Sequence, residues 1–289
     1  MACIHGSMSQ DKSHNPFESS SAPKIETIRT PGGHEISFSP ERGGIITSLK
    51  IGGKELLYMD EATFRDTSVS VKGGIPIMFP NAGPIKSSDF PGLKQHGYAR
   101  SSSAWEIGTA EGDNFFSESL KANDDTMRTY PYNVELRIRG EIGKDSSISL
   151  RQEVINYESD KEVPVSMGLH PYFRVPSDEK KNIKFDFAGG DMIEAAVDQW
   201  ANGDFISVDN PKVNDPDAVL RVVLPSVGTL IIDVSKEYKK IWVWSLPDKD
   251  FVCVEPVMRK AGGLVDDPEK IAPGDVLSAK INIRLENSA

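Results

Sequence analysis

The chain has 289 residues, of which 38% are hydrophobic and 26% charged, enough apolar side chains to bury the core of one large domain or two small ones. Its formal net charge of -10 repels nucleic acid and anionic membrane surfaces, which disfavours either as a partner. The two cysteines, Cys3 and Cys253, lie far apart, and no apolar run approaches the roughly 18 residues of a membrane span, so neither a disulfide framework nor a membrane protein is indicated.

The first segment, 1–24, mixes serine, histidine and asparagine with acidic and basic residues and shows neither helical nor strand periodicity. It also lacks the apolar stretch of a signal peptide. We therefore expect a disordered tail over 1–24, a single folded domain over 25–289, a cytoplasmic location and, by default, a monomer.

Twenty-four glycines and 19 prolines divide the rest of the chain into short segments in which apolar and polar residues alternate. Val134, Leu136 and Ile138, for example, share one face, and the charged residues between them take the other, which is the pattern of a half-buried strand. In chain order, the predicted strands cover 24–29, 34–39, 45–51, 133–139, 148–150, 183–187, 218–224, 229–234, 240–244, 251–255 and 277–285.

The pattern predicts one helix, a short one around 60–66. Many short strands with turn residues between them predict an all-β fold, a large antiparallel β-sandwich or barrel. The sequence has no fixed-period repeat, which disfavours a propeller or a solenoid.

The sequence lacks the common signatures of cofactor and nucleophile chemistry: G-x-G-x-x-G, G-x-x-x-x-G-K-[ST], C-x-x-C, H-E-x-x-H and G-x-S-x-G. General acid–base catalysis by histidine and carboxylate, without a cofactor or a metal, is therefore the simplest enzymatic interpretation. His5 and His14 fall in the expected tail, so His34, His96 and His170 remain as candidates for a site.

His170 is followed by Pro171, which favours an extended backbone at His170 and removes a backbone donor from the next position. We therefore expect a strand to end there, near the rim of a sheet. Alternation puts the small residues Ser166 and Gly168 on the face of His170, which leaves room for a ligand or for a neighbouring loop. A histidine that only hydrogen-bonds a turn also fits this segment.

Glu255 ends the apolar run 251–254 and precedes Pro256, so a strand end is expected here too. Its neighbours on the same face, Phe251 and Cys253, are apolar, and partial desolvation tends to raise the pKa of a carboxyl group toward values useful in catalysis. A structural ion pair is the alternative.

A third cluster, 72–84 followed by 95–100, combines glycines and prolines that exclude a regular central strand and indicate a structured loop system. Gln95, His96 and Arg100 offer donors and acceptors suited to a polyhydroxylated or anionic ligand. A well-capped hairpin without a ligand is the alternative.

The tryptophans divide into two kinds. Trp242 and Trp244 share one face of a predicted strand, which we interpret as core packing. Trp200 follows Asp198 in a polar turn, where the ring and the carboxylate either hold a sugar together or pack as ordinary structure.

Four segments occur in an order that resembles the aldose 1-epimerase (galactose mutarotase-like) superfamily, nearest its hexose-6-phosphate mutarotase, or glucose-6-phosphate 1-epimerase, branch. They are GGIPIMFP at 73–80, QHGYAR at 95–100, LHPYF at 169–173 and VCVEP at 252–256, and the resemblance extends from about 25 to 285. The family fold is a large antiparallel β-sandwich, which agrees with the strand pattern.

The resemblance implies a metal-free and cofactor-free isomerase that interconverts the α and β anomers of a hexose 6-phosphate, with glucose 6-phosphate as the expected sugar. Glu255 would be the general base at the C1 hydroxyl and His170 the general acid at the ring oxygen, each contributing about 10² to 10⁴ in rate. The residues implied to hold the substrate are Lys72, Gln95, His96, Arg100 and Asp198.

Lys72 stands where the hexose-6-phosphate branch usually has arginine, so this position supplies charge without a two-pronged guanidinium contact to phosphate. Two alternatives therefore stay open: an aldose 1-epimerase for unphosphorylated hexoses, and a carbohydrate-binding protein of the same fold that has lost turnover.

Overall fold

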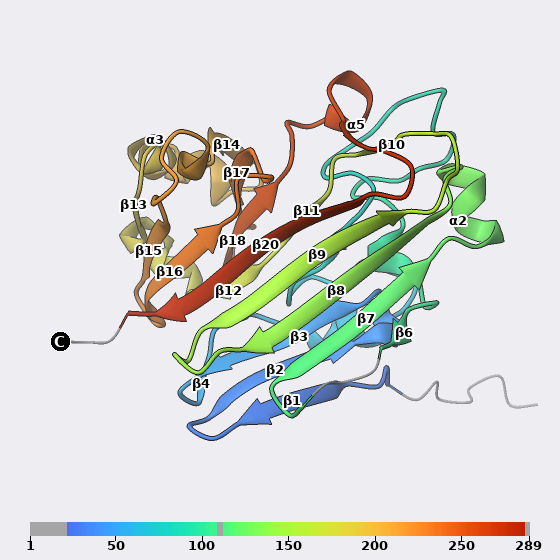
Figure 1. Ribbon diagram of the computed structural model, residues 1–289. Helices are drawn as coiled ribbons and strands as arrows, with labels where there is room; N and C mark the ends of the chain where they lie inside the picture. The colour runs from blue at the N-terminus through green and yellow to red at the C-terminus, as the bar shows by residue number, and fades with distance from the viewer. Residues whose placement is uncertain (1–21, 109–111, 287–289) are drawn as a thin grey trace, which may run out of the picture.

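The computed structural model describes residues 22–108 and 112–286, over which the chain forms twenty strands joined by short helices. Nearly all of the tail predicted at 1–24 lies outside the described residues. Every pairing between the strands is antiparallel, and the sheets stack in layers, so the predicted all-β antiparallel sandwich is confirmed (Figure 1).

One layer is an eight-stranded sheet whose long central strands bury alternate residues. In β9, for example, Ile148, Leu150, Gln152 and Val154 are buried while Ser149, Arg151 and Glu153 are more exposed, an alternation typical of a strand with one face in the core. Its strands, in spatial order, are β13 (Lys184–Asp186), β15 (Leu220–Leu224), β16 (Gly228–Val234), β20 (Val276–Leu285), β9 (Ile148–Asn156), β8 (Val134–Ile142), β7 (Phe115–Lys121) and β6 (Glu106–Ile107).

The opposing layer consists of a four-stranded and a six-stranded sheet, which a bridge between Ile46 and Ile75 connects. The four-stranded sheet contains β1 (Glu26–Thr30), β2 (His34–Ser39), β3 (Ile45–Ile51) and β4 (Lys54–Glu55). The six-stranded sheet contains β14 (Ile206–Asp209), β17 (Lys240–Trp244), β18 (Phe251–Val257), β11 (Gly168–Leu169) and β5 (Ile77–Met78), with β12 (Tyr172–Arg174) also paired to β18. Two further strands, β10 (Val163–Val165) and β19 (Glu269–Ile271), form a separate pair.

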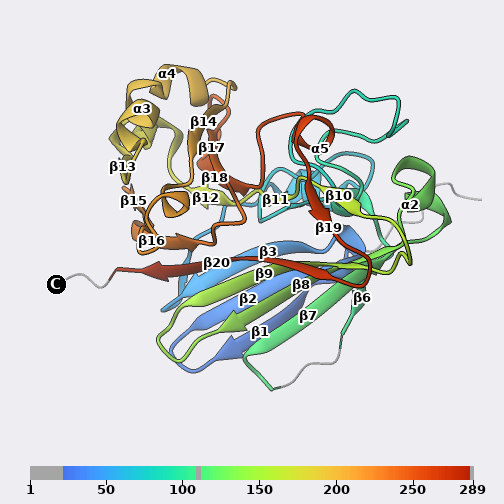
Figure 2. The same cartoon turned by 45° about the horizontal axis from the view of Figure 1, so that its top comes forward.

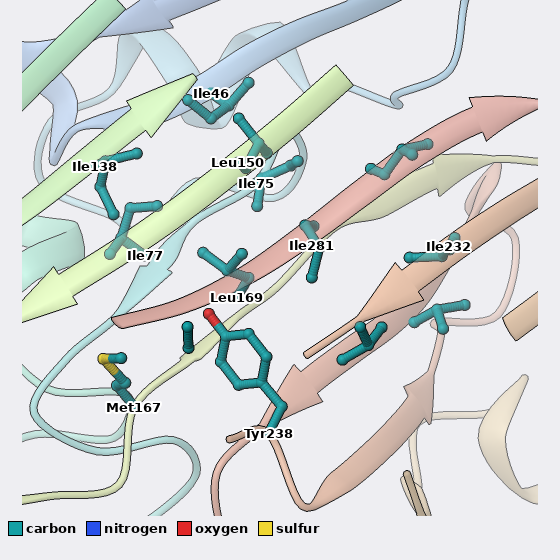
Figure 3. Packing of buried hydrophobic residues seen from close by; sticks show 14 of the residues in the cluster. Ile46, Ile75, Ile77, Ile138, Leu150, Met167, Leu169, Ile232, Tyr238 and Ile281 are labelled. Atoms are coloured by element: carbon teal, nitrogen blue, oxygen red, sulfur yellow. The ribbon is translucent and has the colours of Figure 1, made fainter. Parts of the chain in front are cut away.

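The core lies between these layers. Figure 3 shows Ile138, Leu150 and Ile281 of the eight-stranded sheet close to Ile46 and Ile77 of the opposing layer. Phe38 of β2 also stacks on Phe116 of β7, with ring centroids 4.0 Å apart. Burial of aliphatic side chains at about 25 cal/mol per Å² is the main term that holds the six-stranded sheet, and hence the site described below, on its support.

The structure differs from the sequence prediction in its helices. The predicted helix at 60–66 is present as α1 (Glu61–Arg65), with the Asp60 side chain accepting a hydrogen bond from the Thr63 amide. Four other α-helices were not predicted, because each is too short to show a helical period and depends on local caps such as the capping box of Asn123 and Thr126. They are α2 (Asp124–Thr129), α3 (Gly190–Ala195), α4 (Val197–Trp200) and α5 (Gly263–Asp266), and the 3₁₀ turns are η1 (Pro40–Arg42), η2 (Ala99–Ser101), η3 (Ser177–Asn182) and η4 (Pro211–Val213). Within the described ranges, no helix is long and apolar enough to cross a membrane.

Strand β7 was also missed, and the reason is visible in its sequence. Phe116, Glu118 and Leu120 all face the core, so the alternation that marks the neighbouring strands is broken by a carboxyl group in the apolar row. The outcome is a buried glutamate within the sandwich.

Candidate active site

The two candidate catalytic residues face each other across the six-stranded sheet. Gly168 pairs with Val257 and Tyr172 with Cys253, and the same antiparallel register places His170 opposite Glu255. Strand β11 ends at Leu169, as predicted, because Pro171 interrupts the sheet between β11 and β12. The His170 side chain thus meets Glu255 at a gap in the strand ladder.

The prediction that a strand ends at Glu255 is wrong. Strand β18 continues through Pro256 to Val257, with Glu255 opposite Trp242 of β17 and Pro256 opposite Ile241. The missing amide of the proline is tolerated here, because the pairing of β18 with β11 on the other side consists of Gly168 and Val257 and does not include Pro256. Glu255 therefore lies within a continuous strand, and the break in the strand pairing lies in the facing segment, between β11 and β12.

The His170–Glu255 pair is buried and close. His170 Nε2 lies 3.5 Å from Glu255 Oε1, and the residues are 6% and 3% exposed. Burial raises the pKa of Glu255 well above its ordinary value, with the Arg100 charge opposing the rise. Burial also lowers the pKa of His170 well below its ordinary value, reinforced by His96, Arg100 and Lys72. The resting pair is therefore driven toward its uncharged form, in which the two groups hold one proton between them.

The loop around Gly83, which precedes His96 in the chain, holds this histidine in the cavity wall. Its backbone amide donates to the Gly83 carbonyl at 3.0 Å, and the Gly83 amide donates to His96 Nδ1 at 3.0 Å. His96 has a φ of 65°, a left-handed conformation that is strained for a residue with a side chain. Gly97 follows with a φ of 74°, and a Cβ there would lie 1.8 Å from the Phe79 carbonyl oxygen, so only glycine fits.

The His96 ring is neutral and its proton can be placed. Burial, helped by the charges of Arg100 and Lys72, lowers the pKa of His96 to about 3. Because Nδ1 accepts from Gly83, the proton of the neutral ring is on Nε2. The Gln95 side-chain nitrogen lies 3.1 Å from that Nε2, and since both atoms donate, a hydrogen bond between the two side chains requires the Gln95 amide to turn its Oε1 toward the ring. The ring meets that of His170 edge-on, with centroids 5.4 Å apart. Gln95 and His96 can therefore present one linked donor–acceptor pair to a hydroxyl group.

Two cations, Lys72 and Arg100, border the same cavity without an anionic partner. Neither side chain forms an ion pair or a hydrogen bond with any residue in the described part of the chain, and Lys72 Nζ lies 5.4 Å from the centre of the Trp244 ring. Burial lowers the pKa of Lys72, with the Arg100 charge adding to the effect, and burial also lowers the pKa of Arg100. Such half-buried and unpaired cations suit an anionic ligand.

Aromatic side chains form the remaining wall of the cavity, and their positions correct one interpretation drawn from the sequence. Tyr172 stacks on His170 with centroids 4.8 Å apart, and Trp244 meets the His170 ring edge-on at 5.9 Å. Trp242 stacks at an angle on Phe205 at 4.9 Å. We interpreted Trp242 and Trp244 as core packing. Trp242 is 3% exposed and packs in a buried cluster with Met78, Ala82 and Val257, as expected, but it also lines the cavity, and so does the more exposed Trp244. Alternation shows that two residues share a face, and it does not show whether that face meets the core or a ligand.

Asp198 and Trp200 do not reach the site. Trp200 is 1% exposed and its indole nitrogen donates to the Ile193 carbonyl at 2.8 Å, so the ring is part of the core. Asp198 is exposed on α4 and is not among the residues that line the cavity. The expected polar turn is a short helix that turns Trp200 inward and leaves Asp198 in solvent. Gly203 and Phe205, just beyond this helix, reach the cavity instead.

The assembled cavity has a volume of about 430 Å³, within the range of small-molecule sites. Figure 2 shows its supporting strands β17, β18, β12 and β11 above the long strands of the eight-stranded sheet. Its acid–base pair, its two cations and its aromatic surfaces match the chemistry of a polyhydroxylated anion. Cys253 adds a thiol beside His170 and Glu255 that is a potential metal ligand. The lining residues are Lys72, Gly83, Pro84, Gln95, His96, Arg100, His170, Tyr172, Gly203, Phe205, Trp242, Trp244 and Glu255.

Sequence comparisons relate the chain to sugar epimerases. The family model described as "Aldose 1-epimerase" matches residues 25–280. A Salmonella typhimurium protein named "Putative glucose-6-phosphate 1-epimerase" is 28% identical over 167 residues, 57% of this chain and 52% of that protein. A protein of the same name from Cenchrus ciliaris is 26% identical over 174 residues, 53% of this chain and 51% of that one. The chain thus spans about half the length of the curated relatives it matches.

Solved structures resemble the chain over a longer stretch. The Slr1438 protein from Synechocystis sp. PCC 6803 superposes with a TM-score of 0.77 at 25% identity, covering 93% of this chain and 98% of that one. A galactose mutarotase related enzyme from Lactobacillus acidophilus superposes with a TM-score of 0.68 at 18% identity, covering 92% and 98%. Both likenesses support the antiparallel β-sandwich.

Proposed function

We propose that this chain, which belongs to the aldose 1-epimerase family, interconverts the α and β anomers of a hexose 6-phosphate, with glucose 6-phosphate as the first candidate. One observation carries the proposal: the buried pair of His170 and Glu255 shares a cavity with two cations that lack anionic partners among residues 22–108 and 112–286. The name of the S. typhimurium relative refers to the same sugar phosphate.

The reaction needs an acid and a base near one carbon atom. Glu255 as carboxylate accepts the proton of the C1 hydroxyl, His170 donates a proton to the ring oxygen, and the bond between C1 and the ring oxygen breaks. The open-chain aldehyde rotates about its C1–C2 bond, and the reverse transfers close the ring with the other configuration. The two oxygens share C1, so side chains 3.5 Å apart can serve both.

The charges of the cavity couple phosphate binding to this chemistry. The working form of the pair, a carboxylate beside an imidazolium, holds the same number of protons as the resting form. Lys72 and Arg100 oppose the imidazolium by lowering the pKa of His170. A phosphate group carrying a charge of about -2 offsets both cations, so we expect a phosphorylated sugar to make His170 easier to protonate. A free hexose carries no charge, so with it Lys72 and Arg100 continue to lower the pKa of His170.

The remaining side chains have roles in holding the sugar. Gln95 and His96 are placed to exchange hydrogen bonds with ring hydroxyls. Trp244 and Tyr172 offer apolar faces on which the carbon–hydrogen surface of a sugar packs. Positioning of this kind fixes C1 between the acid and the base.

Two-dimensional exchange NMR on the anomeric protons tests the proposal. We expect catalytic amounts of the protein to accelerate exchange for glucose 6-phosphate much more than for glucose or galactose, each compared with buffer alone. Equal acceleration of free and phosphorylated sugars would point to an unphosphorylated aldose 1-epimerase. No acceleration for any sugar, in a folded protein that still binds one, would point to a carbohydrate-binding protein.

A further inference from the structure

Cys253 has no role in the proposed reaction, yet it lies beside both residues that do. It stands two positions before Glu255 on β18 and opposite Tyr172. One ligand atom each from His170, Cys253 and Glu255 lies within 4.8 Å of the others, and all three residues are buried. We propose that this trio binds a thiophilic divalent cation, with Zn²⁺ as the reference ion, and that the bound cation inhibits the enzyme.

The donor set and its spacing suit zinc. Thiolate, imidazole and carboxylate are its usual ligands, at about 2.0–2.3 Å, and two such atoms in a tetrahedron lie about 3.3–3.8 Å apart. The 3.5 Å between His170 Nε2 and Glu255 Oε1 falls in that range. The thiol lies within 4.8 Å of its two partners, so it has at most about 1.3 Å to move to reach the roughly 3.5 Å expected between a sulfur and a nitrogen or oxygen ligand. Three protein ligands leave the fourth position of a tetrahedral zinc site to a water molecule or another small ligand.

The imidazole of His170 is available as a ligand. Its Nδ1 is buried without a hydrogen-bond partner in the described part of the chain, and its Nε2 meets Glu255 at a distance too long for a strong hydrogen bond. The ring is held in place by its stacking on Tyr172, and no strong hydrogen bond competes with a metal for its nitrogens.

Charge balance favours the bound state. A dication with one thiolate, one carboxylate and one neutral imidazole forms a neutral cluster, which a buried site accommodates better than an isolated charge. Binding releases two protons to solvent, one from the Cys253 thiol and one from the His170–Glu255 pair. Lys72 and Arg100 repel the incoming cation, so they limit its affinity.

The occupied site is incompatible with the proposed reaction. The metal takes the lone pair of His170 and the carboxylate of Glu255, which leaves neither an acid nor a base for the sugar. Sugar phosphate and metal should therefore exclude each other. The inhibition rests on the proposed function, whereas the metal binding does not.

Titration of the chelator-treated full chain with Co²⁺ tests the binding directly. We expect one ion per chain and a thiolate-to-cobalt charge-transfer band that persists in the matched control Cys3→Ser and is lost in Cys253→Ala. Zn²⁺ affinity should fall by more than about 100-fold in Cys253→Ala, beyond the loss caused by removing a hydrogen bond to a ligand. Calorimetry in buffers of different ionisation enthalpy should report about two protons released per Zn²⁺, and Lys72→Gln should bind the ion more tightly.

The outcomes separate this proposal from the preceding one. A wild-type cobalt spectrum without a thiolate band overturns the site, whether or not Cys253→Ala folds, and so does unchanged Zn²⁺ affinity in that variant. Metal binding by a protein that exchanges no sugar anomers would leave the site in place and remove the proposed function. Unimpaired glucose 6-phosphate exchange at saturating Zn²⁺ would overturn the inhibition.

Discussion

Two buried carboxyl groups in this molecule, Glu255 on β18 and Glu118 on β7, have opposite surroundings. They are 3% and 0% exposed, and burial raises the pKa of Glu255 well above its ordinary value and that of Glu118 to about 8. Neither oxygen of Glu118 has a hydrogen-bond partner in the described ranges, and its face-mates Phe116 and Leu120 are core residues. Glu255 lies 3.5 Å from the His170 imidazole and lines a cavity that it shares with Arg100, whose charge partly opposes the rise of its pKa. Burial alone therefore perturbs a carboxyl pKa, and a reactive site also needs a proton partner and room for a substrate.

The largest difference should appear in turnover. Glu255→Gln keeps the size of the side chain and removes the base, so we expect the rate of anomer exchange on glucose 6-phosphate to fall by about 10² to 10⁴. Exchange NMR at saturating sugar measures it, with the melting temperature as a check on folding. A rate within a few-fold of the wild type would remove Glu255 from the mechanism.

A smaller effect should follow loss of a cavity cation. Arg100→Gln should raise the KM for glucose 6-phosphate by about 10- to 100-fold, since a charge-assisted hydrogen bond contributes about 1.5–3 kcal/mol. The same variant should change binding of free glucose much less. Saturation transfer or calorimetric titration with both sugars compares them, and equal weakening for both would place Arg100 at a hydroxyl group rather than at phosphate.

Glu118 should affect stability and its pH dependence. Its folded-state pKa lies above the unfolded value, so the folded state holds the proton more tightly and the wild type loses stability as pH rises from about 4.5 through about 8. The loss is at most about 1.4 kcal/mol per pH unit in that window. Glu118→Gln should remove this pH dependence. Its free energy of unfolding, measured with urea, should therefore rise relative to that of the wild type between pH 6 and pH 8. Parallel pH profiles for the two proteins would contradict the buried, unpaired state of Glu118.

The smallest effect is expected at Asp198. This carboxylate is exposed on α4 and does not line the cavity, so Asp198→Asn should change KM and turnover by no more than about twofold. A loss of sugar affinity as large as that of Arg100→Gln would show that the loop around α4 closes onto the substrate.

Alternation along the sequence was enough to predict most of the long strands, because each has one face in the core and one outside it. It failed at β7, where Glu118 occupies a core position, and at α2 to α5, whose caps act over only a few residues. The prolines after His170 and Glu255 marked both as unusual positions. Only one of them interrupts the sheet, and which one depends on the strands that pair with it.

The composition of the site was partly predictable, and its geometry was not. Lys72, Gln95, His96, Arg100, His170 and Glu255 all reach one cavity. The pairing of His170 with Glu255 depends on an antiparallel register between segments more than eighty positions apart, which local pattern does not encode. The positions of Trp242 and Trp244 in the cavity wall were missed for a similar reason, because the segments packed against their face decide whether it meets the core or a cavity.

The most direct test of the account makes the same substitution at both carboxyl groups. Exchange NMR on glucose 6-phosphate would compare the wild type, Glu255→Gln and Glu118→Gln at one enzyme concentration and one pH. The account predicts that exchange nearly disappears in Glu255→Gln and stays at the wild-type rate in Glu118→Gln. Equal rates in the two folded variants would contradict the claim that the His170–Glu255 pair opens the sugar ring.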